Sequence, residues 1–111
     1  MKKVANEEFG PVIFYTSDYV FDEVITAILR IAKNKELAIK IGNYILKSKV
    51  TRIIHVDEEI FNDAWKLFTK YKNKEWSFTD CTSFIIMNKF NIKNAFTFNK
   101  HYKQAGYKTL P

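Results

Sequence analysis

The sequence is poor in the residues that form disulfides, linkers and membrane spans: its 111 residues include one cysteine, three glycines and two prolines. Because Cys81 has no second cysteine to pair with, an internal disulfide is excluded, and we expect a cytoplasmic protein. So little glycine and proline excludes a flexible linker or a low-complexity segment. The apolar runs are too short for a membrane span, and the charged start lacks the apolar stretch of a signal peptide.

What the sequence does contain is enough apolar material for one core. Hydrophobic residues make up 47% of the chain and aromatic residues 16%, which excludes a disordered tail. The length is that of a single domain. We therefore expect residues 1–111 to form one domain.

Positive charge is concentrated in the second half of the chain. Residues 1–65 carry nine Lys or Arg and ten Asp or Glu, a net charge of −1, whereas residues 66–111 carry nine Lys and two acids, a net charge of +7. One interpretation is that this charge serves solubility alone. The other is that the basic half binds a polyanion. Charge does not distinguish a nucleic acid from an acidic protein.

Hydrophobic periodicity predicts strands that alternate with helices. Strands are expected at 12–15, 52–56, 95–98 and 106–110. Helices are expected from a cap at Thr16, Ser17 or Asp18 to about 32, from 37 to 46, from a cap at Asp57 to 71, from a cap at Thr79 to 90, and briefly at 99–104. This alternation predicts a three-layer α/β/α fold with a mainly parallel sheet. The expected core includes Phe14, Val24, Ile54, Phe61, Phe84 and Phe98.

Three polar residues lie where parallel strands end, which is where sites form in open sheets. Glu23 lies in the helix after the first strand, Asp80 begins a later helix, and Asn99 follows strand 95–98. Carboxylates gathered at one edge repel each other unless a cation lies between them. Oxygen ligands of this kind suit Mg²⁺ or Mn²⁺. The pattern predicts a metal site that can activate water against a phosphodiester.

Each of these residues has a simpler interpretation. Glu23 is also what an ordinary exposed helix glutamate looks like, and Asp80 also suits a helix N-terminus. Asn99 also suits a turn after a strand. His55 and His101 have no partner at zinc spacing, so neither is predicted to be a ligand.

Three segments resemble the PIN-domain family, and within it the VapC-type toxins. Residues 15–24 read Y-T-S-D-Y-V-F-D-E-V, similar to the family's T-S-D-Y-V-x-D-E-V. Residues 76–84 contain F-T-D-C-T-S, which the family shares, and residues 95–107 are similar to A-F-T-F-D-K-H-F-x-x-A-G-F. The segments occur in the family's order and spacing.

The resemblance implies a Mg²⁺- or Mn²⁺-dependent endoribonuclease that acts on RNA, forms a homodimer and is held inactive by an antitoxin protein. It implies catalytic and metal-binding roles for Glu23, Asp80 and Asn99. It also implies supporting roles beside these acids for Thr79 and Ser83.

The sequence departs from the family in two places. Asn99 stands where the family usually has a fourth carboxylate, and its amide brings no charge, so metal affinity should fall. The family also opens with a strand that ends in aspartate, followed by a crossover helix, a unit of roughly 30 residues or more. Here only residues 1–11 precede Val12, and they contain no strand ending in aspartate. We expect them to be the tail of the crossover helix in an N-terminally truncated fold.

Three hypotheses follow. The first is a toxin-like PIN ribonuclease that is either weakened by its incomplete acidic site or completed by something outside this chain. We expect it to self-associate along the sheet region left open by the absent strand. The second is a non-catalytic remnant of the family that binds RNA or an antitoxin. The third is an unrelated α/β binding module with chance matches to the motifs.

Overall fold

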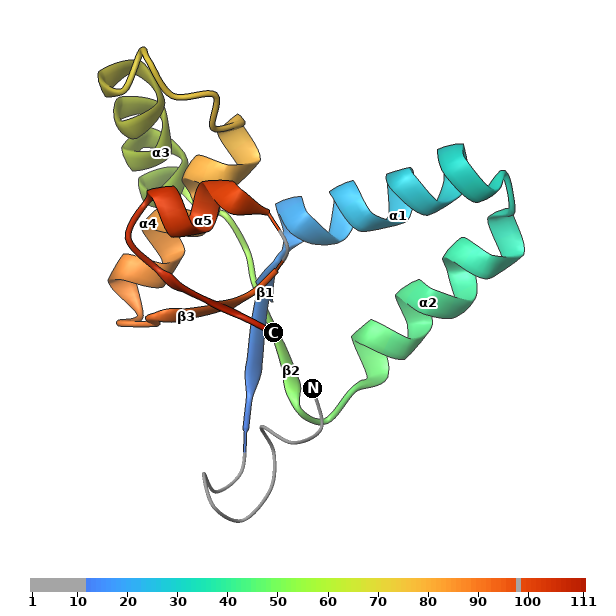
Figure 1. Ribbon diagram of the computed structural model, residues 1–111. Coiled ribbons are helices and arrows are strands. Elements are labelled where there is room, and N and C mark those ends of the chain that lie inside the picture. Colours follow the sequence, from blue (N-terminus) through green and yellow to red (C-terminus); the bar gives the residue numbers. More distant parts are fainter. Residues whose placement is uncertain (1–11, 98) are drawn as a thin grey trace. The chain divides into compact units, whose positions relative to one another are not determined.

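Helices and strands alternate along the chain in the computed structural model, which describes residues 12–97 and 99–111 (Figure 1). The chain divides into two units, Met1–His55 and Val56–Pro111, and each is described by itself. The predicted crossover-helix tail at residues 1–11 and the predicted core residue Phe98 lie outside the described residues. No helix within the described ranges is long and apolar enough to cross a membrane.

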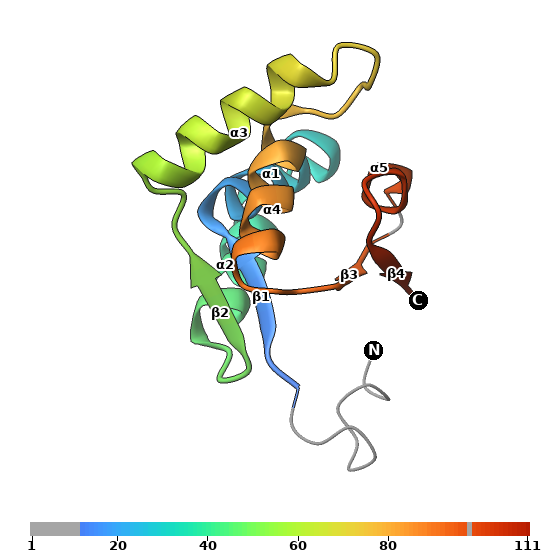
Figure 2. The ribbon, with the colours of Figure 1, turned by 90° about the vertical axis from the view of Figure 1, so that its left-hand side faces the viewer.

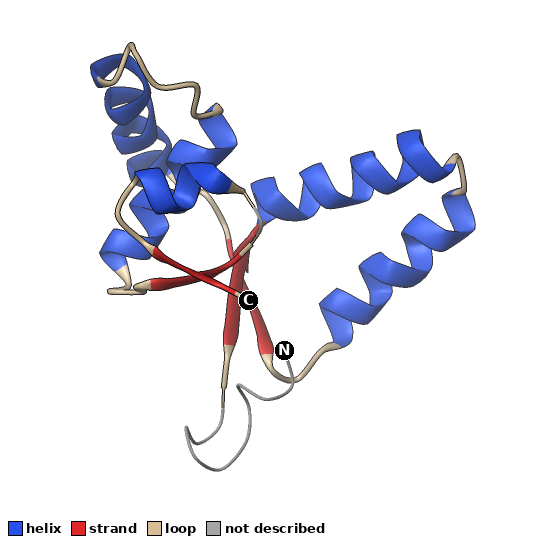
Figure 3. Cartoon of the chain, viewed as in Figure 1, coloured by secondary structure: helices blue, strands red, loops and turns tan. Residues whose placement is uncertain are grey.

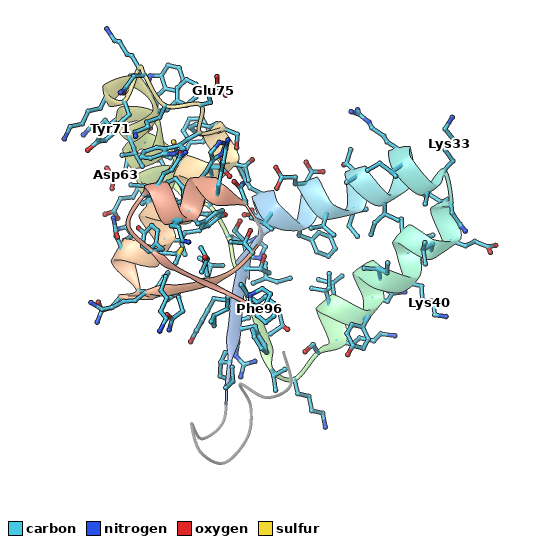
Figure 4. The ribbon with its side chains drawn as sticks, in the orientation of Figure 1. Lys33, Lys40, Asp63, Tyr71, Glu75 and Phe96 are labelled. Carbon is cyan, nitrogen blue, oxygen red and sulfur yellow. The ribbon has the colours of Figure 1, made fainter. Side chains whose placement is uncertain are left out.

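The first unit is built on two parallel strands joined by a pair of helices. Strand β1 (Phe14–Ser17) pairs with β2 (Thr51–Ile54), in a register that sets Phe14 opposite Thr51 and Ser17 opposite Ile54. Parallel neighbours need a long connection, which α1 (Asp18–Ala32) and α2 (Lys35–Lys47) supply as a helical hairpin. Lys33 lies at its turn and Lys40 on α2 (Figure 4).

The two helices of this hairpin approach each other closely at Gly42. A Cβ added there would lie 3.3 Å from Ile25 Cδ1 and 3.5 Å from the Phe21 ring. Val24, predicted to be a core residue, is instead exposed. The face of α1 that meets α2 at Gly42 instead carries Phe21 and Ile25.

The second unit combines helices with a second parallel strand pair (Figure 2). Strand β3 (Asn94–Phe96) pairs with β4 (Lys108–Leu110), with Ala95 opposite Thr109. Its helices are α3 (Glu58–Lys70), α4 (Phe78–Lys89) and α5 (Lys100–Gln104). Helices interspersed with parallel strands confirm the predicted α/β class (Figure 3). The described strands form two two-stranded sheets. Strand β1 begins two residues later than the predicted strand 12–15, and β2 and β4 are shorter than the predicted strands 52–56 and 106–110.

An aromatic cluster around Phe84 holds the second unit together. Phe84 is 2% exposed, and its ring centroid lies 5.1 Å from that of Trp76, 5.0 Å from Tyr102 and 5.7 Å from Tyr107. These rings come from the loop before α4, from α5 and from the approach to β4. The cluster therefore fixes α5 and the end of the chain against α4.

Phe61, also predicted to be a core residue, lies outside this cluster and is exposed. Its ring contacts Phe78 edge-on, with centroids 5.1 Å apart. Helix α3 instead buries Ile60 and Ala64, one turn apart on the neighbouring face. Its predicted cap is confirmed, because Asp57 Oδ1 accepts a hydrogen bond from the Ile60 amide at 2.8 Å. Tyr71 and Glu75 mark the loop that follows α3 (Figure 4).

Candidate active site around Asp80

Asp80 lies in the first turn of α4, where two reciprocal hydrogen bonds fix it. Ser77 Oγ accepts a hydrogen bond from the Asp80 amide at 3.0 Å, and Asp80 Oδ2 accepts one from the Ser77 amide at 3.1 Å. This is a capping box, which satisfies two backbone donors at a helix start. The cap is thus Ser77 rather than the predicted Thr79, because only Ser77 lies three residues before an acid able to return the bond.

Helix α5 brings two more donors to the same carboxylate. Asn99 caps α5, with its Oδ1 accepting a hydrogen bond from the His101 amide at 2.9 Å. Its Nδ2 donates to Asp80 Oδ1 at 3.4 Å, and His101 Nδ1 lies 3.0 Å from Asp80 Oδ2. Both carboxylate oxygens therefore have donors, and these come from two different helix starts.

Burial explains why Asp80 needs so many partners. The residue is 7% exposed, and a buried charge is costly unless it is paired and hydrogen-bonded. Every buried side-chain nitrogen or oxygen among the described residues has a hydrogen-bond partner. The Asp80 carboxylate is therefore fixed by hydrogen bonds where α4 contacts α5, unlike an ordinary surface aspartate.

Of the predicted site residues, the structure brings Asp80 and Asn99 together. Glu23 lies exposed on α1 in the first unit, and its approach to Asp80 stays a prediction. Thr79 and Ser83 are both half-buried in α4. The Thr79 carbonyl accepts a hydrogen bond from Thr82 Oγ1 at 2.6 Å, and the proposed supporting roles of Thr79 and Ser83 stay predictions.

His101 contacts Asp80, although the sequence does not predict it as a site residue. Zinc spacing does not identify His101, because its partner is a carboxylate 21 residues away in the sequence. The available signal was its place two residues after Asn99. A histidine in the first turn of a helix capped by a site residue is directed toward the same site.

The donor set fits a hard divalent cation. Asp80 offers a carboxylate, and Asn99 has an amide oxygen that already accepts the His101 amide. Both are ligand types that Mg²⁺ and Mn²⁺ accept, and Mg²⁺ typically keeps several waters and needs only one or two carboxylates. Among residues 12–97 and 99–111, no three His, Cys, Asp or Glu side chains gather closely enough to hold a metal by themselves. Any ion held here would therefore depend strongly on Asp80.

Cys81, the neighbour of Asp80, faces the core and is completely buried. Burial, and to a smaller extent the Asp80 charge, raise the pKa of its thiol from 9.0 to about 11. The reactive species is the thiolate, and its population near pH 8 therefore falls by about a hundredfold relative to an ordinary cysteine. Cys81 is therefore an unreactive core residue.

We expect the folded chain to react with a thiol reagent at pH 8 at least about a hundredfold more slowly than the chain in urea, because both access and thiolate are lost. The measurement is the rate of colour release from a disulfide reagent, with the urea-unfolded chain as the control. Equal rates in the two states would show that Cys81 is accessible.

The chain combines parallel α/β units with a hydrogen-bonded aspartate at the start of a helix, in the segment F-T-D-C-T-S. These features are those of a PIN-type domain. No family model matches the sequence. The chain is 32% identical over 97 residues to the 23S rRNA-specific endonuclease VapC20 of Mycobacterium tuberculosis, in each of two strains, covering 87% of this chain and 72% of the relative. It is also similar to the crystal structure of that organism's VapC20, described as a sarcin–ricin-loop-cleaving toxin, with a TM-score of 0.80 and 30% identity over 96% of this chain and 78% of the other.

The chain therefore belongs to the VapC family of PIN-domain toxin ribonucleases. This membership confirms the resemblance that the three sequence segments indicated, and the structural match confirms the predicted fold class.

Proposed function

We propose that this chain is a Mg²⁺- or Mn²⁺-dependent endoribonuclease toxin that cleaves ribosomal RNA. The observation that carries the proposal is the buried Asp80 carboxylate, held by α4 and contacted by Asn99. It stands in a chain that is 32% identical to a 23S rRNA-specific endonuclease.

In this proposal Asp80, Asn99 and Glu23 hold the cation, and Thr79 and Ser83 support them from α4. The bound ion would stabilise charge that develops on the phosphodiester and lower the pKa of a bound water. The chain's own part is to keep Asp80 fixed and partly shielded from solvent, so that little reorganisation is needed when RNA binds.

Lysines supply the attraction for the RNA. Residues 66–111 carry the net charge of +7, and Lys100 and Lys103 are exposed on α5, in the same short helix as His101. Phosphate contacts from lysine give affinity that falls as salt rises. RNA as the partner also favours a cytoplasmic location.

Two protein partners belong to the proposal, an antitoxin and a second copy of the chain. The α1–α2 hairpin exposes large apolar side chains, among them Ile31 at 83% and Tyr44 at 79%. Surfaces of this kind mark protein–protein contacts. Each described strand has one hydrogen-bonded neighbour, so the predicted association through open strand edges remains part of the proposal, beside contact through the hairpin.

The direct test is to map cleavage on ribosomes and on isolated 23S rRNA in the presence of Mn²⁺, by primer extension across the sarcin–ricin loop. We expect a cut within the loop that EDTA prevents. A transcript lacking the loop is the control. Cutting that ignores the loop would contradict the proposed substrate, and an absence of cutting on every RNA would contradict the activity.

A specific observation favours a second function, that of a non-catalytic family member that binds RNA or an antitoxin. Three donors already occupy the Asp80 carboxylate, and Asn99 brings an amide where the family usually has a charge. The two functions differ in one result: the second predicts RNA binding by gel shift without cleavage in Mn²⁺.

Replacing Asn99 by aspartate should make the site depend on metal. In Asn99→Asp the new carboxylate still caps α5 but meets Asp80 across a contact that is now 3.4 Å, so the two charges repel each other without a cation. We expect a lower melting temperature in EDTA, a gain in melting temperature with Mn²⁺ larger than that of the unmodified chain, and about tenfold tighter Mn²⁺ binding, because affinity follows ligand charge.

The measurement is thermal unfolding with and without Mn²⁺, and the control is Asn88→Asp, on the exposed end of α4. A variant of Asn99 that Mn²⁺ stabilises no more than the control would show that this position does not face a cation.

A further inference from the structure

The Asp80 carboxylate receives one contact that helix capping does not require. Oδ2 already accepts the Ser77 amide in the capping box, and His101 Nδ1 makes a second contact with the same oxygen at 3.0 Å. The carboxylate would be fixed to α4 without it. The His101 contact therefore affects how the carboxylate is oriented and which of its two oxygens faces away from the protein donors.

The chemistry of the contact determines its direction. An ionised carboxylate only accepts hydrogen bonds, so the contact exists as a hydrogen bond when Nδ1 carries the hydrogen. Ser77 and His101 then both donate to Oδ2, while Oδ1 has only the longer contact with Asn99 Nδ2, at 3.4 Å. Oδ1 is thus the less occupied oxygen and the one better able to take a cation.

The backbone that carries the imidazole is fixed on both sides. The His101 backbone amide donates a hydrogen bond to Asn99 Oδ1, and the next residue, Tyr102, packs edge-on against the buried Phe84 ring with centroids 5.0 Å apart. The ring is 21% exposed and the Asp80 side chain 10%. A donor fixed on both sides loses little conformational freedom when it makes its bond.

The chain contains a natural comparison, the pair His55 and Asp18. Here too Nδ1 lies near a carboxylate, at 3.3 Å, but the histidine side chain is 78% exposed and that of Asp18 35%. Pairs so exposed to water contribute little. The two histidines of the chain thus make the same type of contact in a buried and in an open setting.

We propose that His101 is a positioning residue for Asp80: its Nδ1–H holds Oδ2 against the protein and leaves Oδ1 directed to the divalent cation. This inference rests on the proposed function, and it adds a residue that touches neither RNA nor metal. Groups that orient a metal-binding side chain typically change affinity or activity 10- to 100-fold when they are removed.

The test uses the full chain and measures Mn²⁺ affinity by calorimetry, with cleavage rates alongside. We expect His101→Ala to bind Mn²⁺ about tenfold or more weakly and to lower kcat, with little change in the KM for RNA. His101→Asn places an amide N–H near the position of Nδ1 and should recover most of the affinity. His101→Gln places its amide farther out and should not. His55→Ala is the control and should bind as the unmodified chain does.

A nitrogen-15 spectrum of the histidine rings adds a readout that is independent of metal. We expect the His101 ring to hold its hydrogen on Nδ1 in the unmodified chain. If that hydrogen resides on Nε2, the inference is overturned. Because the spectrum is recorded on the unmodified chain, this test holds even if His101→Ala fails to fold.

The results separate this inference from the proposed function. Mn²⁺ binding that is unchanged in His101→Ala, or weakened equally in His101→Asn and His101→Gln, overturns the inference and leaves the ribonuclease proposal standing. Weaker binding in His101→Ala with no RNA cleavage by any form supports the positioning role while contradicting the ribonuclease. An unmodified chain that binds no Mn²⁺ contradicts both.

Discussion

Replacing Asp80 by alanine should reduce RNA cleavage at least about a hundredfold, because removing one pre-positioned electrostatic group commonly costs that much. In this chain the expected loss is large because Asp80 is the only acid in α4 and α5. The substitution also leaves His101 Nδ1 and the Ser77 amide without their acceptor. Both hydrogen bonds are partly buried, and an unmade bond costs roughly 1–3 kcal/mol when its donor is fully buried.

Because part of the effect falls on folding, the cleavage rate must be measured where the variant is folded. Thermal melting followed by circular dichroism gives the temperature below which the variant is folded. Asp80→Asn provides a second variant that keeps the size of the side chain. Asp63→Ala on α3 is the matched control, since it removes an aspartate from the same unit. A folded Asp80→Ala that cleaves RNA at the rate of the control would show that catalysis does not depend on Asp80.

The second large effect is expected from Phe84→Ala, which should lower the free energy of unfolding by about 3–5 kcal/mol, the usual cost of removing a buried phenylalanine. The cost should lie in the upper part of this range because three aromatic rings surround Phe84 at centroid distances of 5.0 to 5.7 Å and cannot all close in on the space. Aromatic pairs also contribute beyond the area they bury.

The substitution should also loosen the contact between His101 and Asp80, because the Phe84–Tyr102 contact fixes the helix that carries His101. Urea unfolding followed by fluorescence of the tryptophans gives the free energy, with Phe90→Ala, an exposed phenylalanine at the end of the same helix, as the control. We expect the control to change stability by less than about 1 kcal/mol. Similar losses in the two variants would show that the Phe84 cluster is not the core of this unit.

The sequence predicted the fold class because the signals for it are local. Asp57 caps α3 as expected, and the strand–helix alternation recurs in the structure. The depth of burial was harder to predict: Val24 and Phe61 lie on apolar stripes, but both are exposed. Periodicity identifies the face that could be buried, whereas the area actually covered depends on how the neighbouring helix packs.

The candidate site was predictable in part for the same reason. Asp80 and Asn99 were singled out from their places beside a helix start and a strand end, and they contact each other. His101 was not, since its partner is set by the packing of α5 on α4. The cap of α4 is Ser77 and not the predicted Thr79, because the Ser77 amide also donates a hydrogen bond to the Asp80 carboxylate. The approach of Glu23 to these residues remains a prediction.

The claim that this chain is a metal-dependent ribonuclease is tested most directly by its rate of 23S rRNA cleavage as Mn²⁺ is added back after treatment with EDTA. We expect no cleavage in EDTA and a rate that rises and saturates with Mn²⁺. Because Asn99 supplies no charge, saturation should need a higher Mn²⁺ concentration than in Asn99→Asp. Cleavage that persists in EDTA, or a chain inactive at every Mn²⁺ concentration, would contradict the claim.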